Sequence, residues 1–181
     1  LDNKVIGALF FAIGLMVICS YGLHLYTGKV CYVFDNNKEY WLQIPIIWLG
    51  NLLGTALVAL LLTYTRLGVN LASNARQLCE IKCFDSLLSL FVLGILCNIM
   101  IYIAVEGYKS ISYEVGKYLS VFLGVAVFIL CGFEHSVADM FYFWLSGSIN
   151  TNVLIRLLVI TAGNAVGGIV FHQAKKWATQ Q

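Results

Sequence analysis

Charged residues are scarce in this sequence of 181 residues. Only 11% of the residues are charged, 60% are hydrophobic, and the mean hydropathy is +0.85. A water-soluble domain carries charge on about a quarter of its residues, because charged side chains cover the surface that faces water. The composition therefore predicts an integral membrane protein whose solvent is largely lipid.

Several signatures of soluble function are also missing. The net charge is only +2, with no basic cluster beyond Lys175 and Lys176, so no nucleic-acid partner is expected. The sequence has no phosphate-binding glycine loop, no HExxH or ExxH pattern, and no recognisable nucleophile–base pair. We therefore predict no cofactor, no metal site and no enzymatic activity. The cysteines lack CxxC pairing and are predicted to be structural: Cys19, Cys31, Cys79, Cys83, Cys97 and Cys131.

Five apolar stretches approach the roughly 20 residues that a membrane helix needs. They are residues 5–26, 44–65, 86–106, 117–146 (interrupted) and 153–172. Lys175 and Lys176 follow the last stretch and predict a cytoplasmic C-terminus in the inner (plasma) membrane. The connection 66–84 then lies outside despite its basic residues, and an odd number of spans leaves the N-terminus outside as well. We expect residues 1–181 to form one transmembrane pore domain that lacks an N-terminal helix.

Two short patterns occur twice in the sequence. Gly50–Gly54 and Gly163–Gly167 both read Gly-Asn-x-x-Gly, and upstream of them Gly22–Thr27 aligns with Gly132–Val137. Units of three spans place the second copy upside down in the membrane, with the substrate path at the interface between the copies. The alternative is chance, because Gly and Asn are ordinary helix-packing residues in membranes.

The fourth apolar stretch is interrupted by three ionisable residues, Glu134, His135 and Asp139. Each costs about 2.5 kcal/mol or more at membrane depth unless it faces a cavity or a partner. A broken helix beside a water-filled path is the economical interpretation, and Glu134 is expected to accept backbone N–H bonds there. His135, with an ordinary pKa of roughly 6.5, is the first candidate for a functional residue; its alternative is a buried neutral histidine. A metal site with Asp139 lacks the other ligands.

These motifs make the chain resemble the formate/nitrite transporter family. They are Leu25–Gly28, Gly50–Gly54, Gly94–Asn98, Gly132–Ser136 and Gly163–Gly168. The resemblance implies an all-α, aquaporin-like bundle of six helices, the first absent here, with an inverted repeat and two broken helices. It also implies a homopentamer in the lipid bilayer with one pore in each protomer.

The resemblance further implies a pore with apolar constrictions around a polar chamber. The constriction residues would be Phe11, Leu15, Leu25 and Phe128. The chamber would hold Thr27, Asn98, His135 and Asn164, although hydrogen bonding between helices is an alternative for the asparagines. Lys82 falls at the position of a family lysine that draws anions inward.

The implied function is a passive or proton-linked channel for small monovalent anions or their conjugate acids. His24 stands where the family commonly has an acidic residue, which resembles the hydrosulfide ion channel branch; hydrosulfide, formate and nitrite are the expected permeants. The alternative function is an aquaporin-like pore for small neutral solutes.

Overall fold

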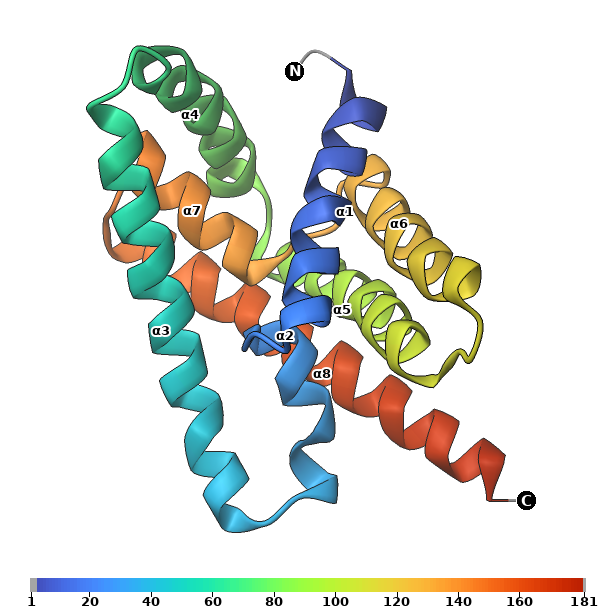
Figure 1. The fold of residues 1–181 in the computed structure, drawn as a ribbon. Helices are drawn as coiled ribbons and strands as arrows, with labels where there is room; N and C mark the ends of the chain where they lie inside the picture. Colours follow the sequence, from blue (N-terminus) through green and yellow to red (C-terminus); the bar gives the residue numbers. More distant parts are fainter. Residues whose placement is uncertain (1–2, 181) are drawn as a thin grey trace.

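The computed structural model describes residues 3–180 and shows a bundle of helices (Figure 1). The expected domain, 1–181, extends beyond the described residues at both ends. The elements are α1 (Lys4–Tyr21), α2 (Tyr26–Lys29), the 3₁₀ helix η1 (Val30–Asp35), α3 (Lys38–Thr63), α4 (Gly68–Phe84), α5 (Leu87–Ser110), α6 (Glu114–Leu130), α7 (Ser136–Ser146) and α8 (Thr151–Thr179). Four of them, α1, α3, α5 and α8, are long and apolar enough to cross a membrane.

Side-chain caps set the starts of the three longest helices. The side chains of Asn37, Ser86 and Asn150 accept hydrogen bonds from backbone N–H groups in the first turns of α3, α5 and α8, at 3.1, 3.1 and 3.0 Å. These bonds satisfy N–H groups that have no partner within the helix. Short polar caps between apolar runs therefore divide the chain into its spans.

The two predicted helix breaks are present and have the same backbone geometry. Gly22 directly follows α1 and Gly132 is the second residue after α6, with φ of 66° and 70°, a left-handed conformation that favours glycine. The next residue closes the turn in each case: Leu23 N–H donates to Ile18 O and Phe133 N–H to Phe128 O, both at 2.9 Å. The first half thus contains α1, α2, η1 and α3, and the second contains α5, α6, α7 and α8, which confirms the repeat.

Helix α5 is the centre of the bundle and packs on α6 and α8, while α1 lies beside α6 (Figure 1). Glycines allow α5 and α8 to approach closely: a Cβ on Gly163 or Gly167 would run into the carbonyl oxygen of Phe91 or Ile95. The corresponding glycines of α3, Gly50 and Gly54, have nothing within 4 Å of such a Cβ. The face of α3 that carries Gly50 and Gly54 is therefore uncovered, whereas the equivalent face of α8 packs against α5.

The segment 66–84 differs from its expectation as a connection. It contains the 17-residue helix α4, which packs against α7 and buries Ala75, Cys79 and Lys82. Its many polar residues hid this helix from a search for apolar runs, because only one face is in contact with the bundle. The six cysteines are free; Cys31, Cys79 and Cys97 are buried, whereas Cys131 is exposed.

Candidate functional site

Two asparagines stabilise the non-helical backbone of the two helix breaks through equivalent hydrogen bonds. Asn164 Oδ1 accepts from the N–H of Ser136 at 2.9 Å, and its Nδ2 donates to the carbonyl oxygens of Glu134 and Gly94, each at 2.8 Å. Asn51 Oδ1 accepts from the N–H of Tyr26 at 2.9 Å, and its Nδ2 donates to the carbonyl oxygen of His24 at 3.0 Å. Each amide replaces backbone bonds that the broken helix cannot form.

Each asparagine brackets a single residue with these bonds. The bracketed residue is Leu25 in the first half and His135 in the second, which are also the residues that the sequence alignment pairs. Both are buried, at 7% and 4% exposed. The repeat therefore presents an apolar side chain at one break and an imidazole at the other.

The imidazole of His135 has both ring nitrogens engaged. Its Nδ1 accepts from the backbone N–H of Ala138 at 3.1 Å and caps α7, while its Nε2 lies 3.0 Å from Thr27 Oγ1. Because Nδ1 accepts a hydrogen bond, the hydrogen of a neutral ring belongs on Nε2. The bond to Thr27 then joins the two halves of the repeat through an imidazole N–H donor.

Aromatic and aliphatic side chains surround this imidazole. The ring of Phe128 stacks on that of His135 at 5.7 Å between centroids, and Phe11 meets His135 edge-on at 6.0 Å. A cavity of about 370 Å³ is lined by Phe11, Leu15, Leu25 and His135, together with residues that include Ile18, Ile101 and Tyr142. His135 thus contributes a polar group to an otherwise largely apolar wall.

The structure brings some of the predicted site residues together and places others behind them. Thr27, Asn98 and Asn164 are each 0% exposed and are not among the lining residues of this cavity. Asn98 Nδ2 donates to the backbone oxygen of Asn164 at 2.6 Å, and its Oδ1 has no hydrogen-bond partner in the described residues. The side chains of these two asparagines form hydrogen bonds with backbone groups next to the cavity, and Thr27 orients the His135 ring.

Lys82 forms a buried cluster with two acidic residues. Its ammonium group is ion-paired with Glu134 and lies 2.9 Å from Asp139 Oδ1; the three residues are 9%, 6% and 1% exposed. Glu134 was expected to accept backbone N–H bonds, but its carboxylate pairs with Lys82 instead. Asp139 also faces Lys82, and its Oδ2 has no hydrogen-bond partner within residues 3–180.

Sequence reasoning missed this cluster, although one signal pointed to it. Ionisable groups at membrane depth need partners of opposite charge, and Lys82 is a basic residue just before the helix that carries Asn98. Its separation of 52 residues from Glu134 gives no local pattern that identifies the pair.

Long apolar helices, an inverted repeat with two broken helices, and a cavity where the breaks meet define a multi-pass membrane protein of the channel and transporter class. Residues 2–178 match the family model for the formate/nitrite transporter. The chain belongs to this family.

Individual comparisons agree with this assignment. The nitrite transporter NirC of Salmonella typhimurium is 31% identical over 191 aligned residues, which cover 96% of this chain and 70% of NirC. A solved FNT family ion channel superposes with a TM-score of 0.85 at 28% identity, covering 97% of this chain and 77% of that one. A pentameric formate channel with formate bound has a TM-score of 0.80 at 25% identity, covering 98% and 83%.

Proposed function

We propose that this protein conducts small monovalent anions, or their conjugate acids, along a path past His135 in each subunit. The observation that carries the proposal is the bond between His135 Nε2 and Thr27 Oγ1 at the meeting point of the two helix breaks, beside an apolar cavity. Formate and nitrite are the proposed permeants, because the similar proteins include a nitrite transporter and a formate channel. Hydrosulfide is proposed from the resemblance at His24 alone.

The apolar wall around His135 makes passage costly for a bare anion. Phe11, Leu15 and Leu25 offer no hydrogen bonds, so a bare anion would lose its water without compensation. An anion beside His135 can accept the Nε2 hydrogen in competition with Thr27, and a hydrogen bond to a charged acceptor contributes about 1.5–3 kcal/mol. The neutral conjugate acid passes the apolar wall at a lower cost.

The geometry favours a neutral His135 that donates a hydrogen bond over a histidine that donates its proton. An imidazolium carries hydrogen on both nitrogens, and Nδ1 already accepts the Ala138 N–H. Protonation of His135 would therefore break the cap of α7. In this proposal a proton accompanies the anion from solution, and the proton-linked version requires α7 to lose that bond.

We also propose that the complete pore has six helices and forms a homopentamer. The open face of α3 at Gly50 and Gly54 corresponds by the repeat to the face of α8 that α5 covers, so it fits one further helix of the same chain. A solved relative is described as pentameric, and exposed apolar residues along α1 and α3 suit contacts with lipid or neighbouring subunits. The cytoplasmic C-terminus is proposed from Lys175 and Lys176.

Liposome flux of the purified full-length protein tests the anion proposal against a neutral-solute pore. We expect formate and nitrite to enter at least about tenfold faster than into protein-free liposomes, with glycerol entry unchanged. The reason is that a charged acceptor gains a stronger hydrogen bond from the imidazole N–H than a neutral hydroxyl does. Tenfold is the effect of about 1.4 kcal/mol. Glycerol flux without formate or nitrite flux would instead support the aquaporin-like alternative.

A further inference from the structure

A second, smaller cavity shares Leu25 with the cavity beside His135. It has a volume of about 80 Å³, and its lining includes Gly22, Leu23, Lys29, Val105 and Lys109. Leu25 and Ile18 line both this cavity and the larger one beside His135. The two cavities therefore share a wall at these two apolar side chains, and we call the smaller cavity the antechamber.

Two lysines from different elements line this antechamber. Lys29 ends α2 and is half-buried, and Lys109 lies in the last turn of α5 and is exposed. The Lys109 ammonium stands 4.3 Å from the centroid of the Tyr32 ring and donates to its hydroxyl at 3.2 Å. No carboxylate lies within ion-pair distance of Lys29 or Lys109 in the described part of the chain.

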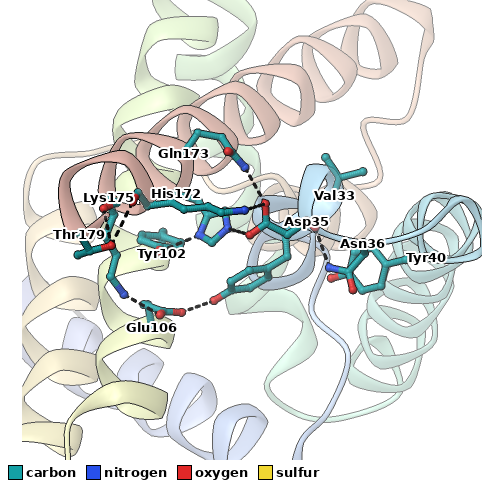
Figure 2. A network of polar contacts seen from close by, with 12 residues as sticks. Val33, Asp35, Asn36, Tyr40, Tyr102, Glu106, His172, Gln173, Lys175 and Thr179 are labelled. Atoms are coloured by element: carbon teal, nitrogen blue, oxygen red, sulfur yellow. Dashed lines mark hydrogen bonds and ion pairs between the residues drawn. The ribbon is translucent and has the colours of Figure 1, made fainter. Parts of the chain in front are cut away.

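Two acidic residues, Asp35 of η1 and Glu106 of α5, are already paired with lysines of α8. Figure 2 shows the network that links η1, α5 and α8. Lys176 lies 3.0 Å from Asp35 Oδ1, and Lys175 lies 2.7 Å from Glu106 Oε1. Tyr32 donates to the other oxygen of Glu106 at 2.6 Å.

Three residues of α8 stabilise the negative charge of Asp35. His172 Nε2 lies 2.9 Å from Asp35 Oδ2, and Gln173 donates to Oδ1 at 3.1 Å. These bonds and the Lys176 ammonium hold the pKa of Asp35 well below its usual range. Asp35 and Glu106 are therefore already paired with lysines of α8, and Glu106 is linked to Lys109 through the Tyr32 hydroxyl without a direct ion pair. Lys29 and Lys109 thus have no carboxylate of their own beside the antechamber in the described part of the chain.

We infer that Lys29 and Lys109 make this antechamber a capture site for small monovalent anions about to pass Leu25. The inference rests on the proposed function and adds the residues that concentrate the permeant. An excess of positive charge in a narrow space with low-dielectric walls raises the local concentration of anions. Lys82 is less suited to this role, because its ammonium group is already paired with Glu134 and Asp139.

Formate conductance of the full-length protein at two ionic strengths tests this inference. At about 10 mM the Debye length is roughly 30 Å, and at about 1 M it is roughly 3 Å. We expect Lys29→Gln with Lys109→Gln to lower formate conductance about threefold or more at 10 mM and to leave it near wild type at 1 M, where impermeant potassium gluconate screens the lysines. The Lys29→Arg and Lys109→Arg pair keeps the charge and should conduct as the wild type does at both ionic strengths.

Lys38→Gln is the matched control. Lys38 begins α3 just after η1, is exposed and does not line the antechamber, so its removal should leave conductance unchanged at both ionic strengths. A double Gln variant that matches wild type at 10 mM overturns the capture site, and so does one that loses the same factor at 10 mM and 1 M. A wild-type protein that conducts no formate overturns the proposed function itself.

Discussion

The Lys82→Met variant is expected to have a free energy of unfolding about 3–5 kcal/mol lower than that of the wild type, because removing one partner of a buried ion pair leaves uncompensated charge. Here the loss strands both Glu134 and Asp139, which are almost completely buried. Thermal unfolding of the purified full-length protein in detergent measures the effect as a fall in Tm. Methionine keeps the length of the side chain, so the lost charge dominates the comparison.

A triple variant separates this charge effect from a loss of packing. Lys82→Met combined with Glu134→Gln and Asp139→Asn removes all three charges, and we expect it to recover most of the stability. Lys38→Met, at an exposed position, should change stability by no more than about 0.5 kcal/mol. A Tm for Lys82→Met equal to that of the wild type would contradict a structural role for the cluster.

The same triple variant clarifies how anions are attracted to the pore. Lys82→Ala alone does not separate anion conduction from a neutral-solute pore, because it removes the partner of two buried carboxyl groups and is expected to destabilise the fold. In the triple variant the fold is expected to survive without the lysine charge. A pore that depends on attraction by Lys82 loses formate flux in this variant, whereas one served by Lys29 and Lys109 keeps it.

Gly167→Leu is expected to cost about 3 kcal/mol or more, because its side chain must push α8 away from the backbone of α5 at Ile95. Overpacking in a core typically costs about 1–3 kcal/mol, and backbone carbonyls yield less readily than side chains. The measurement is the yield of monodisperse full-length protein in detergent and its Tm. Wild-type yield and Tm would contradict the close α5–α8 contact.

Gly54→Leu at the equivalent position of α3 tests the proposed sixth helix. If one further helix of the chain covers Gly50 and Gly54 as α5 covers Gly163 and Gly167, the cost should approach that of Gly167→Leu. If this face meets lipid, leucine should be neutral or stabilising by up to about 1 kcal/mol, because it is the better helix former. The sign of the change decides between the two.

Local sequence predicted much of the fold and the centre of the site. Glycines at the helix breaks and ionisable residues in an apolar run have costs that only a broken helix beside a cavity resolves, so the region around His135 was recognisable. The alignment of Gly22–Thr27 with Gly132–Val137 also pairs Leu25 with His135. The bonds of Asn51 and Asn164 to these two breaks explain why the Gly-Asn pattern recurs.

Features that depend on distant partners were not predictable from local patterns. Helix α4 lacks a long apolar run, and the cluster around Lys82 joins residues from α4, the second break and α7. The last helix extends to Thr179, beyond the predicted end at residue 172, because its polar final turns bond to Asp35 and Glu106. In each case the stabilising partner is far away in the sequence.

The most direct test of a path past His135 is formate flux into liposomes from pH 5 to pH 8 for the wild type, His135→Asn and His135→Ala, with Tm confirming that each variant is folded. We expect His135→Ala to lose about tenfold or more of the flux, since it removes a hydrogen bond of about 1.5–3 kcal/mol to a charged acceptor. His135→Asn, which keeps an N–H donor but cannot titrate, should retain more flux with altered selectivity among formate, nitrite and hydrosulfide. Flux, pH dependence and selectivity that match the wild type in both variants would remove His135 from the path.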